Sequence, residues 1–178
     1  MALPPDPKID IRPLDAEEIR ARVGELASVL ADCVAGGASV NFMLPFSTAD
    51  ATPFWLSVAD AVEAGSRVCL AALVDGIAMG TVQLLFAPQP NQPHRADVAK
   101  LLVHRSMRGR GLGRALMQRV EVEAALHGRS LLTLDTALGG DAERLYVRLG
   151  WHGAGLIPGY ALWPEGGECD TVLFWKRI

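Results

Sequence analysis

Three alternate glycines in the run Arg108–Gly113, which reads RGRGLG, constrain this chain more than any other feature of its sequence. An apolar strand is predicted directly before the run, over Ala96–Val103, and an amphipathic helix directly after it. Glycine lets the backbone approach a ligand closely, and the N–H groups at a helix start have no partner inside the helix. The combination predicts a site that receives anions, phosphates above all.

Arg108, Arg110 and Arg114 surround the same turn and would add full positive charges to the partial charge of the helix start. A ligand with several phosphates would suit this arrangement. A tight turn with solvated arginines would explain the same residues without a ligand, so the turn alone leaves both interpretations open. Two common phosphate loops are excluded, because no Gly-Lys-Ser/Thr follows the turn and its glycines do not match G-x-G-x-x-G.

The composition predicts one globular domain that covers residues 1–178. With 50% hydrophobic and 21% charged residues, the chain can bury a substantial core but is too short to expect two domains. Its net charge of -3 argues against a general nucleic-acid binder. No apolar run approaches membrane-spanning length, and the N-terminal residues Pro4, Pro5 and Asp6 lack an apolar signal core. We therefore expect a cytoplasmic protein with neither a membrane nor a nucleic acid as partner.

The cysteines and histidines argue against a disulfide framework and against a metal site. Cys33, Cys69 and Cys169 are odd in number and lack any C-x-x-C spacing. No histidine has a partner at metal-ligand spacing, so we expect no metal. His104 directly follows the predicted strand and is best explained as a solvent-facing residue on a basic turn, with contact to a substrate or a phosphate as the alternative.

The N-terminal part of the chain is predicted to form a strand, a helix and an unusually apolar loop. Ile9–Arg12 alternate in polarity, and Asp15 with Glu18 forms a capping box at the start of a helix. Apolar residues recur at helical spacing until Gly36-Gly37, which would end the helix through a left-handed residue. The loop Ala38–Met43 would either pack for structural reasons or form the lip of a substrate pocket.

Strands and helices alternate in the rest of the chain, which predicts a mixed, partly parallel central sheet flanked by helices in an α/β or α+β domain. A tight turn at Asp75-Gly76 would join two long strands into a hairpin. The elements predicted after the apolar loop are a helix from Thr52-Pro53 to Gly65, strands Arg67–Val74 and Ile77–Phe86, a surface loop Ala87–His94, a strand Ala96–Val103, a helix from Leu112, a strand Leu131–Asp135, a helix Asp141–Leu149, and strands Gly153–Leu156 and Thr171–Trp175.

Two motifs together resemble the GNAT family, the Gcn5-related N-acetyltransferases, over the C-terminal half of the chain. The Arg-x-x-Gly-x-Gly turn, Arg108–Gly113, resembles the loop that holds the pyrophosphate of coenzyme A in that family. Leu145–Trp151, which reads LYVRLGW, resembles the family's helix that ends in an aromatic residue after Leu-Gly. The resemblance implies the GNAT acyltransferase fold and an acetyl-CoA-dependent N-acetyltransferase.

The resemblance also implies which residues contact the co-substrate acetyl-CoA. Backbone N–H groups of Leu102 and Val103 would bind pantetheine and polarise the thioester carbonyl. Tyr146 would lie beside the sulfur and donate a proton to the departing thiolate. The implied diphosphate-binding residues are Arg108, Gly109, Arg110, Gly111, Leu112, Gly113 and Arg114.

The general base is open between Asp97 and Asp135. A solvated strand end would equally explain Asp97, and a helix or turn cap would equally explain Asp135, without a catalytic role. Asp97 matches a position where some family members carry a glutamate that deprotonates the amine through water. Asp135 lies at the end of the next predicted strand, where carboxylates commonly line a site in open α/β sheets. Two departures from the family pattern also matter: Arg105 stands where proline is frequent, and Gly139 replaces an asparagine that often contacts the cofactor. The second departure removes a side-chain contact to pantetheine.

Several further segments resemble one subgroup of that family, the tabtoxin resistance type of bacterial acetyltransferase, which acetylates an amino-acid-like toxin that contains a β-lactam. This finer resemblance implies that Ser39, Phe42 and Tyr160 line the acceptor pocket. The matching segments are Ala35–Val40, Phe42-Met43, Arg95–Val98, Leu134–Thr136 and Pro158–Tyr160.

We therefore expect transfer of the acetyl group of acetyl-CoA to the amine of a small molecule, such as an amino-acid-like toxin or antibiotic. No cysteine stands near the glycine turn in the sequence, which favours direct transfer in a ternary complex over a covalent acetyl-enzyme. The alternatives are a non-catalytic module that binds or senses acyl-CoA and a transferase for a longer acyl group. Homodimers are common in that family, and the apolar strand Val172–Trp175 would suit either a dimer interface or the core.

Overall fold

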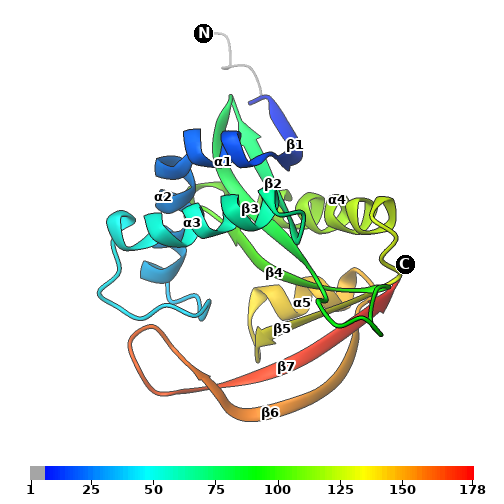
Figure 1. Ribbon diagram of the computed structural model, residues 1–178. Helices are drawn as coiled ribbons and strands as arrows, with labels where there is room; N and C mark the ends of the chain where they lie inside the picture. The colour runs from blue at the N-terminus through cyan, green and yellow to red at the C-terminus, as the bar shows by residue number, and fades with distance from the viewer. Residues whose placement is uncertain (1–6) are drawn as a thin grey trace, which may run out of the picture.

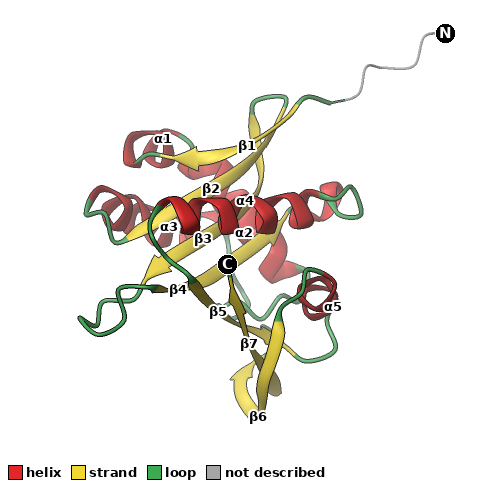
Figure 2. Ribbon diagram, turned by 90° about the vertical axis from the view of Figure 1, so that its right-hand side faces the viewer, coloured by secondary structure: helices red, strands yellow, loops and turns green. Residues whose placement is uncertain are grey.

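The computed structural model describes residues 7–178, so the predicted features at Pro4, Pro5 and Asp6 lie outside the described residues. A seven-stranded sheet of order β1-β2-β3-β4-β5-β7-β6 forms the centre of the molecule (Figure 1). In Figure 2 the strands follow one another from β1 at the top to the edge strand β6 at the bottom. The elements are β1 (Ile9–Leu14), α1 (Ala16–Ala21), α2 (Val23–Ala35), α3 (Thr48–Glu63), β2 (Arg67–Val74), β3 (Ile77–Phe86), β4 (Arg95–Val103), the 3₁₀ helix η1 (Arg105–Met107), α4 (Leu112–Leu126), β5 (Leu131–Ala137), α5 (Asp141–Arg148), β6 (His152–Leu162) and β7 (Glu168–Arg177).

The strands β4 and β5 form the one parallel pair of this sheet, and their pairing is short. Their register joins Arg95 to Leu131, Ala96 to Leu132, and Asp97 to Thr133, and no further pair follows within residues 7–178. Beyond these pairs the strands diverge, which leaves a gap in the middle of the sheet (Figure 1). The predicted mixed sheet is confirmed, because the other neighbouring strands are antiparallel.

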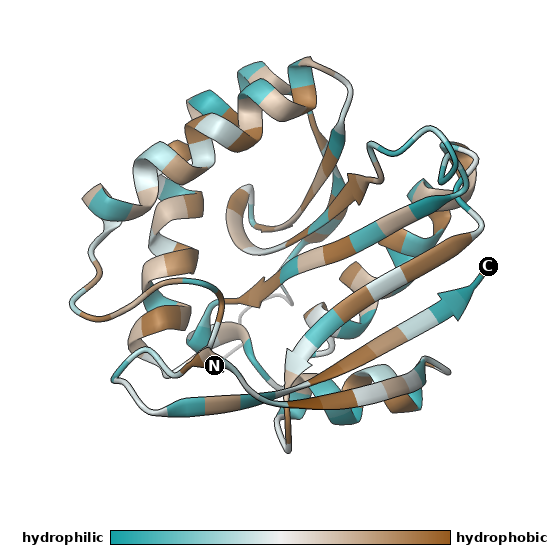
Figure 3. Cartoon of the chain, turned by 60° about the horizontal axis from the view of Figure 1, so that its bottom comes forward, coloured by the Kyte–Doolittle hydropathy of each residue, from teal (hydrophilic) through white to brown (hydrophobic). Residues whose placement is uncertain are grey.

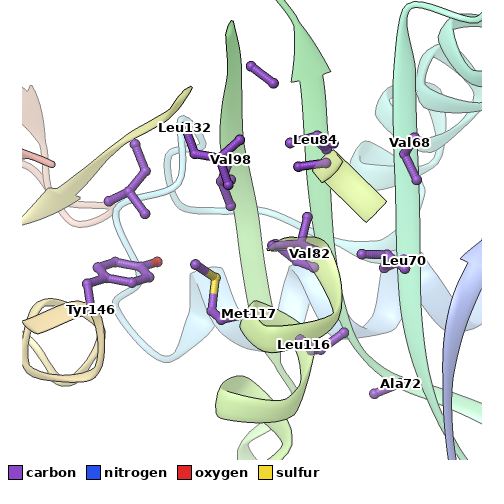
Figure 4. Packing of buried hydrophobic residues seen from close by; sticks show 14 of the residues in the cluster. Val68, Leu70, Ala72, Val82, Leu84, Val98, Leu116, Met117, Leu132 and Tyr146 are labelled. Carbon is purple, nitrogen blue, oxygen red and sulfur yellow. The ribbon is translucent and has the colours of Figure 1, made fainter. Parts of the chain in front are cut away.

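Side chains on the two faces of the sheet form two separate apolar cores. Along β2, Leu70 and Ala72 face α4, whereas Cys69 and Ala71 face α2 and α3, as expected for a strand buried on both sides. The α4 core contains residues from β2 to β5, α4 and α5, and Figure 4 shows part of it. Hydrophobic and hydrophilic bands alternate along the helices in Figure 3, as expected for helices with one face on the sheet.

The predicted start and end of the first helical region are confirmed, but the region is two helices. Asp15 and Glu18 form the capping box, and Gly37 has a φ of 85° just after α2. The break lies at Arg22, where the backbone leaves the helical conformation between α1 and α2. The Arg22 guanidinium donates to the carbonyl oxygen of Gly76 at 2.8 Å, a distant contact that helical periodicity does not reveal.

The predicted start of the next helix at Thr52-Pro53 is wrong, because α3 begins four residues earlier at Thr48. Ser47 and Asp50 form a capping box there, which satisfies N–H groups of the first turn. Pro53 lies inside the helix and removes one backbone donor. The complete capping box therefore decides where this helix starts, and the proline is accommodated.

The predicted hairpin is confirmed at both strands, with Asp75 and Gly76 at φ values of 50° and 87° in the turn. The last two strands are longer than predicted. Most side chains of β6 are exposed, so this edge strand lacks the apolar alternation by which strands are recognised. Among residues 7–178, no helix has the length and apolarity needed to cross a membrane.

Candidate active site

The turn between β4 and α4 leaves the start of α4 open. Gly109 and Gly111 have φ values of 75° and 82°, a backbone conformation that favours glycine. Gly111 is the N-cap of α4 and has no side chain to accept from the first helical N–H groups. These donors therefore point outward with the positive end of the helix dipole, which is the arrangement that binds phosphate.

The arginines of the turn differ in what they contact. The Nε of Arg108 donates to the carbonyl oxygen of Val103 at 3.2 Å, so its side chain folds back against the end of β4. Arg110 and Arg114 are exposed, and neither forms an ion pair or a side-chain hydrogen bond with the part of the chain that the structure describes. Two full charges are therefore available to a ligand beside the open helix start.

No cysteine stands near the glycine turn in the sequence, but the fold brings one close to it. Cys33, at the end of α2, has its Sγ 3.7 Å from a terminal nitrogen of Arg108 and donates to the carbonyl oxygen of Val103 at 3.5 Å. Burial raises the pKa of this thiol, and Arg108 offsets that effect only in part. Cys33 is thus a buried neutral thiol that packs behind the turn, and its chemistry does not suit a nucleophile.

The 3₁₀ helix η1, which leads into the turn, is fixed by the end of α2. Asp32 accepts from the backbone N–H of Arg105 at 2.8 Å and from its Nε at 2.9 Å. The Nε2 of His104 lies 3.6 Å from the same carboxylate, and its Nδ1 is bonded to Ser106. Arg105 and His104 therefore link the turn to the end of α2 through Asp32, and His104, which we expected to face solvent, is only 27% exposed at its side chain.

The backbone of β4 faces the gap at Val103. The N–H of His104 donates to the carbonyl oxygen of Met79 on β3 at 2.9 Å. Because N–H groups alternate in direction along a strand, the N–H of Val103 points away from β3 and into the gap, whereas that of Leu102 points toward Thr81. The carbonyl oxygen of Val103 accepts its hydrogen bonds from Arg108 and Cys33, in agreement with this direction.

Tyr146 reaches the gap from the α4 side of the sheet. Its ring is 6% exposed and packs against Trp151 and Phe174, each at 6.1 Å between ring centroids. Figure 4 shows the ring extending from α5 toward β4, with the hydroxyl at its far end. Burial, assisted by the negative charge of Asp135, raises the pKa of this phenol well above its ordinary value. Tyr146 is therefore protonated at neutral pH.

The two candidate carboxylates lie at different places along the gap. Asp97 is at the closed end, where it pairs with Arg95 at 2.5 Å and accepts from the Thr133 hydroxyl. Asp135 lies two residues further along β5 than Thr133, beyond the last paired residues, and its side chain is exposed. The negative charge of Asp135 also acts on the Tyr146 phenol.

Lys100, a residue that we did not predict as part of the site, has its side chain on the face of the sheet that is turned away from α4. Its Nζ donates to the carbonyl oxygen of Val40 at 2.9 Å and lies 5.7 Å from the ring centroid of Phe42. Burial lowers the pKa of Lys100 to about 8, and the charge of Asp135 counteracts part of this effect. The signal in the sequence was a charged residue inside an otherwise apolar strand, Val98–Val103.

The apolar loop after α2 packs against the core between the sheet and the helices α2 and α3. Hydrogen bonds also join this loop to the end of β6 and the residues just after it. Ser39 donates to the carbonyl oxygen of Leu162 at 2.9 Å, and Leu44 N–H donates to Pro164 at 2.9 Å. Phe42 is partly buried and stacks with Phe46 and Phe54. Tyr160 is 55% exposed, in a stretch of β6 where the pairing with β7 is irregular.

These contacts place Phe42 beside Lys100. The hydroxyl of Ser39, by contrast, donates to a backbone carbonyl oxygen. Gly139, at a φ of 78°, precedes α5, and its N–H is bonded to the side chain of Glu143. Residues 7–178 contain no group of three or more His, Cys, Asp or Glu side chains placed to hold a metal ion.

Comparison with known proteins places this architecture in a known group. Residues 39–151 match the acetyltransferase (GNAT) family model. The protein yncA of Salmonella typhimurium, whose structure contains its cofactor acetyl-CoA, superposes with a TM-score of 0.78 at 18% identity, over 96% of this chain and 94% of that one.

Two further solved structures have the same fold. An N-acetyltransferase of Staphylococcus aureus Mu50 gives a TM-score of 0.78 at 17% identity, over 96% of this chain and 98% of that one. The ribosomal-protein-alanine N-acetyltransferase of Brucella melitensis gives 0.78 at 19% identity, over 95% and 99%. At these identities the likeness concerns the fold alone.

Proposed function

This chain belongs to the acetyltransferase (GNAT) family and is an acetyl-CoA-dependent N-acetyltransferase, and from that premise we propose that it acetylates the amine of a small molecule by direct transfer in a ternary complex. One observation carries the proposal. Strands β4 and β5 stop pairing after Asp97 and Thr133, and the parts that diverge lead toward the uncapped, arginine-flanked start of α4 and contain Asp135. A cofactor and an acceptor can therefore approach from opposite faces and meet between the strands.

The diphosphate of acetyl-CoA would bind the turn of Arg108–Gly113. The residues present fit it, because the first N–H groups of α4 have no capping side chain and Arg110 and Arg114 are exposed beside them. The bound thioester supplies an acetyl group that is already activated. The chain itself must align the reacting atoms, stabilise the developing oxyanion, and manage two protons.

The backbone N–H of Val103 would bind pantetheine or polarise the thioester carbonyl. Its direction into the gap supports Val103 over Leu102, whose N–H points toward β3. A fixed backbone donor is well suited to this task, because it needs no reorganisation when negative charge develops on the carbonyl oxygen.

Tyr146 would donate its proton to the departing thiolate. Its raised pKa keeps the phenol protonated at neutral pH, and its packing holds the ring in one orientation. Asp135 would accept the proton of the acceptor amine, directly or through water. Its exposed side chain, beyond the last β4–β5 pair, supports this role over Asp97, which is engaged by Arg95 and Thr133.

The narrower resemblance to the tabtoxin resistance type leads us to propose an amino-acid-like toxin or antibiotic as acceptor. Phe42 and Tyr160 would contact it, and Ser39 would shape the pocket by fixing the loop to β6. A protein acceptor is the alternative. One structurally similar enzyme, from Brucella melitensis, is named a ribosomal-protein-alanine N-acetyltransferase.

The experiment is release of free thiol from acetyl-CoA in the presence of amino acids, short peptides, polyamines and antibiotic-like amines. Saturable release with one small-molecule class, lost in Tyr146→Phe, is the expected result. Release only with peptides would overturn the small-molecule proposal. Tight binding of coenzyme A with no release for any amine would favour a non-catalytic acyl-CoA module. Competition by acyl-CoA thioesters of increasing chain length separates acetyl transfer from transfer of a longer group.

A further inference from the structure

Lys100 occupies a bulge in β4, three residues beyond Asp97, the last residue of this strand that pairs with β5. The register with β3 shifts between Thr81 and Gln83, and Lys100 has a φ of 53°. Positive φ is costly for a residue with a side chain and is rare outside glycine, asparagine and aspartate. The bulge turns a long cationic side chain toward the apolar loop and α3, the side of the sheet that faces away from α4.

The ammonium group of Lys100 has more N–H donors than hydrogen-bond acceptors within residues 7–178. It has three donors, and one of them bonds to the carbonyl oxygen of Val40 at 2.9 Å. The rings of Phe42 and Phe54 lie 5.7 and 5.8 Å from the nitrogen and provide cation–π attraction. No carboxylate of residues 7–178 lies within 4.0 Å of it. A partly buried cation without an anionic partner is costly unless a ligand completes its coordination.

A second cation increases the positive charge on this side of the sheet. Arg67 at the start of β2 donates to the Oε1 of Gln83 at 2.7 Å, and its charge acts on Lys100. Gln83 lies opposite Ala99, the residue before Lys100. The Nε2 of Gln83, which is 0% exposed, has no hydrogen-bond partner within the described chain. Donors therefore outnumber acceptors around Lys100.

The carboxylate whose negative charge acts on Lys100 is that of Asp135, on the neighbouring strand β5. Its charge acts on both Lys100 and Tyr146, and Asp135 and Lys100 each lie beyond the last β4–β5 pair, on the two strands that diverge. A ligand there would meet negative charge on one side and positive charge on the other. An amine that also carries an anionic group would match both.

We propose that Lys100 binds an anionic group of the acceptor, a carboxylate above all, and so selects amines that carry negative charge. This inference rests on the proposed function, in which Asp135 receives the amine. The amine would lie toward Asp135 and the thioester, while the carboxylate would pair with the Lys100 ammonium beside the ring of Phe42. Lys100 remains mostly protonated at pH 7, as this pairing requires.

The competing explanation is that Lys100 only fastens the apolar loop through Val40. The two roles differ in their dependence on the substrate. A fastening residue would affect every acceptor alike, whereas an anion-binding residue would affect only acceptors that carry the anion.

The test compares acceptors in pairs: L-amino acids, β-alanine and 4-aminobutyrate, each with its carboxamide. Wild type should favour each carboxylate over its amide. Lys100→Met keeps the apolar stem and should reduce kcat/KM at least tenfold for the carboxylates, with little change for the amides. Lys100→Arg, which keeps the positive charge, should retain part of the preference for carboxylates over their amides. Equal losses for both members of a pair, or no preference in wild type, would overturn the proposal.

Two controls separate this result from misfolding and from failure of the proposed function. Lys176→Met removes another partly buried lysine, which bonds to Glu121 and the carbonyl oxygen of Leu149, and should leave the carboxylate preference intact. If no amine is acetylated at all, the proposed function fails. Calorimetric binding of N-acetyl-β-alanine to the coenzyme A complex then decides: binding by wild type and not by Lys100→Met supports the Lys100 site, and equal binding or none overturns it.

Discussion

Asp32 holds Arg105 by two hydrogen bonds, at 2.8 Å from the backbone N–H and 2.9 Å from Nε, and so joins the end of α2 to the turn that precedes α4. The two residues are 73 positions apart in the chain. Gly36 lies against the same arginine, since a Cβ at this position would approach the Cδ of Arg105 to 2.9 Å. The turn of Arg108–Gly113 therefore depends on a helix that contributes nothing to its sequence motif.

We expect Asp32→Ala to weaken acetyl-CoA binding without removing any group that touches the cofactor. The loss of two hydrogen bonds, one to a charged side chain, should lower the free energy of unfolding by about 1 to 2 kcal/mol. Calorimetric titration with coenzyme A and urea unfolding would measure the two effects. Arg105→Ala keeps the backbone hydrogen bond and should show the smaller effect on affinity; an equal or larger effect would contradict this account.

The same carboxylate should contribute acid sensitivity. Burial opposes the charge of Asp32, but hydrogen bonds from Arg105 and the nearby His104 outweigh it and hold the pKa below the ordinary value. A depressed pKa means that the stabilisation is complete above the unfolded-state pKa and is lost as the pH falls through the folded-state value. The difference in unfolding free energy between wild type and Asp32→Asn should therefore shrink below about pH 4. A difference that is independent of pH would contradict this assignment.

Gly111→Ala should separate backbone strain from ligand binding. The φ of 82° at Gly111 should cost an alanine about 1 to 2 kcal/mol, and relaxation of the turn should misplace the N–H groups at the start of α4. Gly128→Ala is the matched control, because Gly128 has a φ of 69° just after the other end of the same helix and is equally open. We expect similar losses of stability but a loss of coenzyme A affinity only at Gly111, as measured by calorimetry.

Local signals explain which parts of this structure could be predicted. The Asp75-Gly76 hairpin, the Asp15 capping box and the glycine turn are each complete within a few consecutive residues, so their geometry follows from residue type alone. The predicted helix start at Pro53 failed because two local signals competed and the Ser47 box prevailed. The divergence of β4 from β5 has no local signal, because it depends on how two separate strands pair in the folded sheet.

The features that sequence reasoning missed depend on partners far apart in the chain. Lys100 donates a hydrogen bond to the carbonyl oxygen of Val40, 60 residues away. Cys33 contacts the guanidinium of Arg108, 75 residues away. A lysine in an apolar strand and a cysteine on a helix face carry no mark of these contacts. Periodicity assigns a residue to a face, and only the tertiary structure brings two faces together.

The choice between the two carboxylates can be tested by their neutral analogues. Asp135→Asn should reduce kcat by on the order of 10²-fold and remove the acidic limb of the pH–rate profile, because the group that accepts the amine proton is lost. Asp97→Asn should leave kcat and that limb nearly unchanged, since its side chain is 46% exposed and already paired with Arg95. The reverse pattern would transfer the role of base to Asp97.

Tyr146→Phe tests the proton donor most directly, because the substitution changes one atom in a closely packed site. The ring would keep its contacts with Trp151 and Phe174, so stability and coenzyme A affinity should stay close to wild type. Without the hydroxyl, the thiolate leaves unprotonated, and kcat should fall by on the order of 10²- to 10⁴-fold. The raised pKa of the phenol adds a second expectation: in wild type, no loss of rate from Tyr146 should occur up to about pH 10, the ordinary value for tyrosine. Thiol release measured across pH for both proteins checks the two effects together. Undiminished turnover in the variant would leave Tyr146 as a packing residue of the α4 core and return the proton to solvent.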